Sequence, residues 1–199
     1  MVTVEVDAAD VERRLSEGKL SCPGCGGRLV GWGHARARSV RDGSGLLRVR
    51  PRRTRCSGCE RTHVLLPVSC LLRRADTVEV IGAALAARAA GAGHRLIAQE
   101  LGRARETVRG WLRRFAGRVE VVRVFFTKVM VRLEVDPVVP GPAGSVWADA
   151  LTAIAGAWSA MSSRFRGGVD LLPVWRSVCA VTSGLLLSPS WPPVAINTN

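Results

Sequence analysis

The sequence predicts an α+β fold, with a small β module at the N-terminus followed by a mainly α-helical remainder. Two CxxC pairs enclose a stretch of turn residues and alternating apolar residues, which is typical of short strands. From residue 76 the apolar residues recur every three or four positions, which indicates helices. The expected parts are an acidic segment over 1–19, the β module over 20–70, a helical region over 75–118, a helical module over 119–187 and an extended tail over 188–199.

The two CxxC pairs are Cys22–Cys25 and Cys56–Cys59. Each pair is a tight turn that presents two thiolates to one metal ion, and two such turns supply the four tetrahedral sulfur ligands that structural zinc prefers. The stretch between them has a strand–turn–strand pattern, as in a zinc ribbon. A closed four-thiolate shell leaves no position for water, so we expect one structural Zn²⁺ per chain that contributes to folding rather than hydrolysis.

Other cysteines and histidines are weaker candidates. His34 and His63 lie near the CxxC pairs, but four thiolates already complete the shell. Cys70 and Cys179 stand alone and are expected to be ordinary buried thiols. The N-terminus is acidic and has no apolar stretch typical of a signal peptide, so we expect a cytoplasmic, nucleoid-associated protein whose paired cysteines bind metal rather than form disulfides.

Three strands are expected in the β module. One lies within 28–40, a turn follows over 42–45, a second strand spans 46–55, and a third covers 62–66 before Pro67. The second strand alternates, which places a row of arginines on its solvent face. The apolar side of this strand consists of Leu47, Val49 and Pro51, and the other side of Arg48, Arg50 and Arg52.

Two short helices joined by a glycine turn predict a helix-turn-helix within 75–118. Ala98 is small where the helices would cross, Gly102 suits the turn, and Val108 would fix the second helix. Two residues depart from the pattern: Arg103 stands where an apolar residue is usual, and Ala104 stands where Ser or Thr would cap the helix. The alternative is a plain three-helix bundle.

The C-terminal region is expected to be helical. Residues 119–136 fit a helix or a strand, and the longer helical stripe favours the helix. After a Pro-rich linker over 137–142, we expect helices over 145–162 and 171–182. The first of these should face the core with a stripe of large residues, namely Trp147, Leu151, Ile154, Trp158 and Met161.

The charge distribution indicates a polyanion partner. The formal net charge is +13, and residues 28–74 carry twelve arginines against Asp42 and Glu60. Residues 88–118 carry eight arginines against Glu100 and Glu106. Arginine concentrated in two motif-bearing segments favours nucleic acid, double-stranded DNA in particular. The expected DNA contacts are Arg48, Arg50, Arg52, Arg53, Arg103, Arg105, Glu106, Thr107, Arg109, Arg113 and Arg114.

We expect no enzymatic activity and assign no catalytic residues. The histidines lack a nearby Ser or Asp pattern that suggests a triad, and no phosphate-binding loop is present. Glu134, Asp136, Asp149 and Asp170 could be considered as a metal-binding set. The segment after Gly117 is too short for a two-metal nuclease domain, so surface carboxylates are the favoured interpretation.

The order of CPGCGGRLVGWGHARARSVRD, RRTRCSGCERTHVLLP and HRLIAQELGRARETVRGWLRRF resembles the N-terminal half of bacterial insertion-sequence transposases. It resembles still more closely a family of short zinc-ribbon/helix-turn-helix proteins of high-GC bacteria. The resemblance covers residues 20–118 and implies that the four cysteines bind zinc and that Arg105 to Arg114 form part of the DNA-binding helix. No catalytic residue carries over, because no catalytic domain matches.

Four functions remain open from the sequence. The favoured one is a sequence-specific, transposase-related DNA-binding protein with a structural zinc. A transcriptional regulator with a C-terminal dimerisation module, and hence a homodimer, is the first alternative. A truncated transposase that recruits a separate catalytic subunit is the second, and an RNA-binding ribbon protein is the third.

Overall fold

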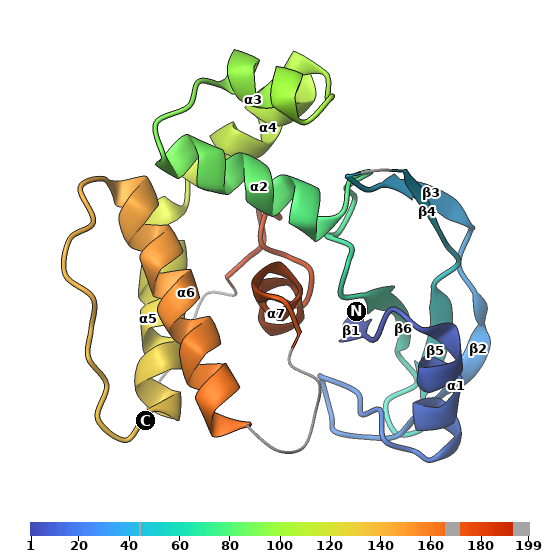
Figure 1. Cartoon of the computed structure of the whole chain (residues 1–199). Coiled ribbons are helices and arrows are strands. Elements are labelled where there is room, and N and C mark those ends of the chain that lie inside the picture. Colours follow the sequence, from blue (N-terminus) through green and yellow to red (C-terminus); the bar gives the residue numbers. More distant parts are fainter. Residues whose placement is uncertain (44, 166–171, 193–199) are drawn as a thin grey trace.

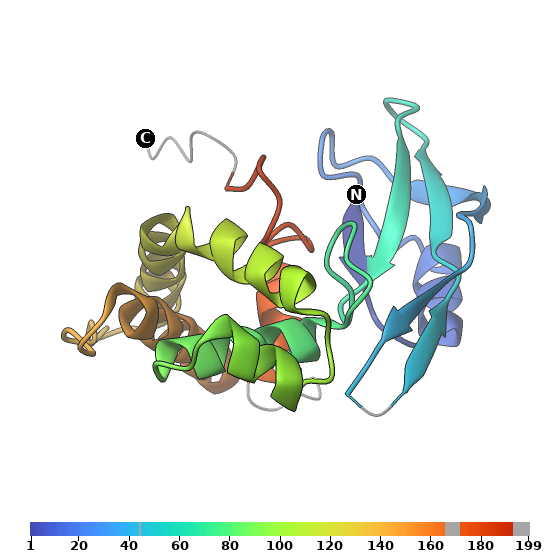
Figure 2. The ribbon, with the colours of Figure 1, turned by 90° about the horizontal axis from the view of Figure 1, so that it is seen from above.

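The computed structural model describes residues 1–43, 45–165 and 172–192 and shows an α+β fold, as expected. The strands gather in one half of the molecule and the larger helices in the other (Figure 1). Seen from above, the two halves lie next to each other (Figure 2). Among the described residues, no helix is long and apolar enough to cross a membrane.

The β half contains a four-stranded sheet with the order β1-β6-β5-β2. Apolar and polar residues alternate along its strands, so the buried apolar side chains share one face. They pack against helix α1 in a cluster that includes Val11, Leu15, Leu29 and Leu65. Asp7 caps α1 by accepting hydrogen bonds from the Ala9 and Asp10 backbone N–H groups. The elements are β1 (Val2–Val4), α1 (Ala8–Ser16), β2 (Leu29–His34), β5 (Arg52–Cys56) and β6 (Thr62–Pro67).

The single strand predicted over 46–55 is wrong. The structure divides it into β4 (Leu46–Val49), which pairs with β3 (Arg38–Arg41) in a separate hairpin, and β5 in the four-stranded sheet. The break falls at Pro51, which has no N–H to donate to a ladder and is buried between the two strands. The strand predicted within 28–40 is present as β2, and a second strand, β3, follows it.

The α half begins with three helices that carry the predicted helix-turn-helix: α2 (Val78–Ala89), α3 (His94–Glu100) and α4 (Arg105–Ala116). The helix expected after residue 119 is present as α5 (Val119–Leu133), and it runs beside α6 (Val146–Arg164) (Figure 1). Helix α7 (Val174–Val181) lies between the halves. It contacts the sheet where the Thr3 hydroxyl donates a hydrogen bond to the Ala180 carbonyl at 3.3 Å.

The face that α6 buries differs from the prediction. Of the five large residues expected to face the core, only Ile154 is buried, and the other four are half-buried. Small residues take their place because α5 and α6 approach closely: a Cβ at Gly156 would lie 2.8 Å from the Met130 Sδ atom. The other buried residues of α6 are Ala150, Ala153, Ala157 and Ala160.

The two isolated cysteines are buried, as expected. The Cys179 thiol donates to the Cys70 carbonyl at 3.2 Å, and burial raises the pKa of Cys179 to about 12. The predicted extended tail is wrong for residues 188–192, which turn back onto the helices. The Trp191 ring is buried and lies 4.9 Å from the Phe125 ring, and Arg118 donates to the Trp191 carbonyl. Residues 193–199 lie outside the described residues, as does residue 171, the first of the helix expected over 171–182.

Candidate metal centre and nucleic-acid interface

Pairing of β2 with β5 brings the four cysteine thiols together. Cys22 and Cys25 lie in the turn before β2, while Cys56 ends β5 and Cys59 lies in the turn before β6. The register sets Leu29 opposite Cys56, which aligns the two turns. All four Sγ atoms lie within 4.8 Å of one another.

The distances between the sulfurs fit one tetrahedral ion. The Cys22 and Cys59 Sγ atoms lie 3.7 Å apart, and those of Cys25 and Cys56 lie 3.4 Å apart. Four sulfurs at about 2.3 Å from a central ion would be separated by about 3.8 Å. No disulfide links the cysteines. The site is therefore a candidate metal centre with four thiolate ligands.

Backbone N–H groups point at the sulfurs. The Gly58 and Cys59 N–H groups donate to the Cys56 Sγ atom at 3.4 and 3.5 Å. The Cys59 N–H group, followed by that of Gly58, lowers the pKa of Cys56 to about 6. The Gly24 N–H group lowers the pKa of Cys22 in the same way. These turns therefore favour the thiolate form that a metal ion requires.

The pKa of Cys25 is shifted in the opposite direction. The Gly27 N–H group lowers the pKa of Cys25, but hydrogen bonding with the Cys56 and Cys59 sulfurs outweighs it and raises the value to about 11. Four adjacent thiols cannot all ionise without a cation, because the negative charges repel one another. The donor set therefore fits a divalent cation that would neutralise this charge.

Of the two histidines near the CxxC pairs, only His63 touches the cluster. Its Nε2 atom lies 3.3 Å from the Cys22 Sγ atom, and its Nδ1 atom lies 3.3 Å from the Met1 amino group. His34 ends β2 opposite Arg52 and takes no part. His63 thus contacts the candidate metal ligand Cys22 without belonging to the four-sulfur set. The spacing of the sequence alone did not predict this contact.

The two helices and the glycine turn expected for a helix-turn-helix are α3, α4 and the residues between them. Ile97, Ala98 and Val108 are buried where the helices pack, and Gly102 in the turn has a positive φ of 60°. Gly102 therefore adopts a backbone conformation that other residues rarely tolerate. Ala104 precedes α4 without any side-chain capping bond, as its sequence predicted.

The outer surface of α4 carries the predicted basic residues. Arg109 has a side chain that is 63% exposed, and its ion pair with Glu106 is long at 3.5 Å. Arg114 donates to the Gly110 carbonyl one turn earlier. Within the described part of the chain, neither Arg105 nor Arg113 pairs with a carboxylate. The exposed residues of α4 are Arg105, Glu106, Arg109, Arg113 and Arg114, and Thr107 is half-buried.

Arg103, predicted as a DNA contact, is instead engaged inside the protein. Its side chain is only 11% exposed, and its Nε atom lies 2.6 Å from the buried Asp76 carboxylate. It also donates to the Asp42 carbonyl at 2.6 Å. Arg41 pairs with the other Asp76 oxygen at 2.6 Å. These contacts join the β3–β4 hairpin to the turn between α3 and α4, and we exclude Arg103 from the interface.

The arginines of the β module do not form the single row that was predicted over 46–55. Arg48, Arg50 and Arg53 are exposed, but Arg52 pairs with Glu12 at 2.8 Å and donates to the Gly33 carbonyl. The split at Pro51 places Arg48 and Arg52 in different sheets. Arg48, Arg50 and Arg53 therefore remain available to a polyanion, whereas Arg52 holds β2 and α1 together.

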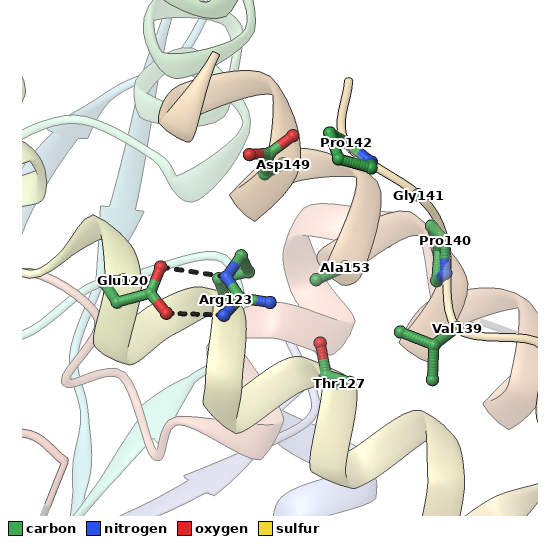
Figure 3. A pocket seen from close by; sticks show the side chains of 9 residues that line it. All are labelled: Glu120, Arg123, Thr127, Val139, Pro140, Gly141, Pro142, Asp149 and Ala153. Carbon is green, nitrogen blue, oxygen red and sulfur yellow. Dashed lines mark hydrogen bonds and ion pairs between the residues drawn. The ribbon is translucent and has the colours of Figure 1, made fainter. Parts of the chain in front are cut away.

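The carboxylates considered as a metal set do not gather. Asp149 accepts a hydrogen bond from the Ala143 N–H group at the start of α6. It lines a pocket of about 390 Å³ with Glu120 and Arg123, which pair with each other (Figure 3). Among the described residues, only the four cysteines form a close metal-ligating group, and Asp170 lies outside them.

Residues 22–111 match the family model described as a domain of unknown function (DUF6431). No curated protein and no solved structure matches the chain. The matched segment begins at the first cysteine of the cluster and ends inside α4. The matched segment therefore includes the four cysteines, the Arg41–Asp76–Arg103 contacts, α3 and the first part of α4.

Proposed function

We propose that this protein is a sequence-specific DNA-binding protein in which the cysteine cluster holds a structural zinc ion and α4 enters the major groove of duplex DNA. The observation that carries the proposal is the exposed basic surface of α4, at the second helix of a helix-turn-helix. In this motif the N-terminal residues of the second helix contact base edges. Arg105 and Arg109 lie there, whereas Arg113 lies one turn further along.

Zinc is the metal that four thiolates at these separations favour. Four cysteine ligands close the coordination shell, so the ion would organise the ribbon rather than carry out a reaction. The ribbon core buries few large side chains, and metal binding would supply folding free energy that this core lacks.

The ribbon extends the basic surface. Arg48 lies on the β3–β4 hairpin and Arg50 directly follows it, and the turn of this hairpin contacts Arg103 beside the start of α4. Phosphate contacts provide affinity and position, and base contacts provide specificity. The hairpin would therefore contact the phosphate backbone while α4 reads the sequence.

The resemblance to the N-terminal half of insertion-sequence transposases extends the proposal to an association with mobile elements. The chain would then act at element ends with a separate catalytic subunit. A neighbouring catalytic transposase gene, or terminal inverted repeats that contain the selected site, would support this role. A single palindromic site upstream of other genes would favour a transcriptional regulator.

The deciding experiment is a selection from random duplexes with the full-length, zinc-loaded protein. Wild type should enrich one motif. Arg105→Ala and Arg109→Ala should relax it at one or two base pairs, since a good bidentate contact contributes about 1–3 kcal/mol. Arg132→Ala, an exposed residue near the end of α5, is the matched control and should keep the wild-type motif. If both α4 variants also keep that motif, α4 is not the reading helix.

A further inference from the structure

Among the described residues, the part of the four-stranded sheet formed by β2, β5 and the start of β6 has one exposed face. The register sets Val30 opposite Arg55, and Arg55 opposite Thr62, so these side chains share a face. The opposite face carries Leu29 and Cys56 and packs in the cluster with α1. We call the uncovered surface the outer sheet face, and its residues are Val30, Trp32, Arg53, Arg55 and Thr62.

Trp32 dominates the outer sheet face. Its side chain belongs to β2, which lies at the edge of the sheet (Figure 1), and it is 54% exposed. The Arg55 guanidinium lies 5.2 Å from the centre of its ring, a cation–π contact that holds the indole in place. Trp32 has glycine on both sides, so no neighbouring side chain on β2 crowds it. The indole is thus presented to solvent instead of contributing to a core.

The surroundings of Trp32 are basic. Arg53 is exposed on β5 and shares its face of the sheet with Arg55. The exposed Glu60 pairs with Arg55 at 2.9 Å, which leaves Arg53 as the excess positive charge of this face among the described residues. An exposed aromatic ring beside arginines matches the two components of single-strand binding surfaces, which stack bases on aromatic rings and attract the phosphate backbone.

We infer that the outer sheet face binds single-stranded DNA, with an unpaired base stacked on Trp32 and an adjacent phosphate near Arg53. A duplex cannot use this site in the same way, because its bases are already stacked on one another. The site is distinct from the duplex-reading surface of α4. The choice of DNA over RNA rests on the proposed function.

A protein partner is less well supported. β2 is an edge strand, and an extended peptide could add to such an edge through backbone hydrogen bonds. The β2–β5 ladder is irregular between Gly31 and His34, however, and Gly33 has a positive φ of 82°. An irregular edge is a poor template for another strand. The exposed ring and the arginines would also have no role in such pairing.

The test measures binding of a fluorescein-labelled twelve-nucleotide oligo-dT to full-length, zinc-loaded protein by anisotropy. Trp32→Ala should weaken binding about 5- to 150-fold, the loss expected for one stacked base. Trp32→Phe should retain most of the affinity. Leu46→Ala removes another exposed apolar side chain on the β3–β4 hairpin and should change nothing. Arg53→Ala should lower the slope of log affinity against log salt by about 0.7. Zinc content and circular dichroism establish that each variant folds.

A duplex of the selected motif and a twelve-nucleotide oligo-rU complete the design. Arg109→Ala should impair duplex recognition and leave oligo-dT binding unchanged. Wild-type affinity for oligo-dT in a folded Trp32→Ala variant would overturn the inference, and so would an equal loss of duplex binding. Tighter, Trp32-dependent binding of oligo-rU would overturn the choice of DNA. Duplex binding without any oligo-dT binding would refute this inference alone, whereas Trp32-dependent oligo-dT binding without duplex binding would refute the proposed function alone.

Discussion

The Arg103 guanidinium reaches the buried carboxylate of Asp76 with an Nε–Oδ1 distance of 2.6 Å, although the two residues are 27 positions apart. Asp76 is 1% exposed and accepts from Arg41 as well, so one carboxylate joins three parts of the chain. These parts are the β3–β4 hairpin, the residues before α2 and the turn between α3 and α4. The position of α4 relative to the ribbon therefore depends on this carboxylate.

Asp76→Asn should destabilise the protein by about 3 kcal/mol. The substitution removes the charge that balances Arg41 and Arg103, and loss of one partner from a buried pair typically costs about 3–5 kcal/mol. The control is Asp10→Asn, because Asp10 pairs with Arg13 on the surface of α1 and should change stability by less than about 1 kcal/mol. Urea denaturation followed by circular dichroism measures both. Equal stability of the two variants would show that the buried pair does not join the halves.

The ion pair between Asp76 and Arg103 could not be predicted from the sequence. Arg103 departs from the usual helix-turn-helix pattern, and the charge pattern alone made it a DNA contact. Its partner lies in a different element, and no local spacing connects the two. Asp76 itself carried no clear signal, because it follows Arg73 and Arg74 and lies three residues before Glu79, so nothing in the local pattern marks it as a buried, paired carboxylate.

Local sequence patterns predicted those parts of the structure that depend on neighbouring residues alone. The two CxxC pairs indicated the cysteine cluster, and the glycine turn indicated α3 and α4. The buried face of α6 was misjudged because the sequence shows which residues are large but not how closely another helix approaches. The strand over 46–55 was misjudged because alternation continues through Pro51, although its missing N–H ends the ladder there.

Removal of a single cysteine should abolish metal binding. Cys25→Ser or Cys56→Ser leaves three thiolates, and we expect loss of the bound zinc together with the ribbon structure. Cys179→Ala is the matched control, since this buried thiol bonds to the Cys70 carbonyl and is not part of the cluster, so the variant should keep one zinc per chain. Elemental analysis of protein purified without chelator measures the zinc content. Metal-free wild type with an intact ribbon would contradict the proposed centre.

Two neighbouring ribbon arginines should differ in their contribution to DNA binding. Arg48 is exposed and, among the described residues, pairs with no carboxylate, whereas Arg52 is held by Glu12. If Arg48 neutralises one phosphate, Arg48→Ala should lower the slope of log affinity against log salt by about 0.9 on any duplex. Arg52→Ala should leave the slope unchanged. Titrations at several salt concentrations test this difference, and identical slopes for both variants would exclude the hairpin from the interface.

Replacement of two glycines inside helices by alanine should change the stability of the protein in opposite directions. A Cβ at Gly82 in α2 would lie 2.2 Å from the Trp175 ring, which α7 holds against it, so Gly82→Ala should destabilise the protein by about 1–3 kcal/mol. A Cβ at Gly110 in α4 would meet only the end of the Arg114 side chain at 3.0 Å, and that side chain can move aside. Alanine is the better helix former by about 1 kcal/mol, so Gly110→Ala should stabilise the protein by up to that amount. Thermal and urea denaturation of the two variants give the sign of each change. Stabilisation by Gly82→Ala would show that α7 does not pack on α2 through Trp175.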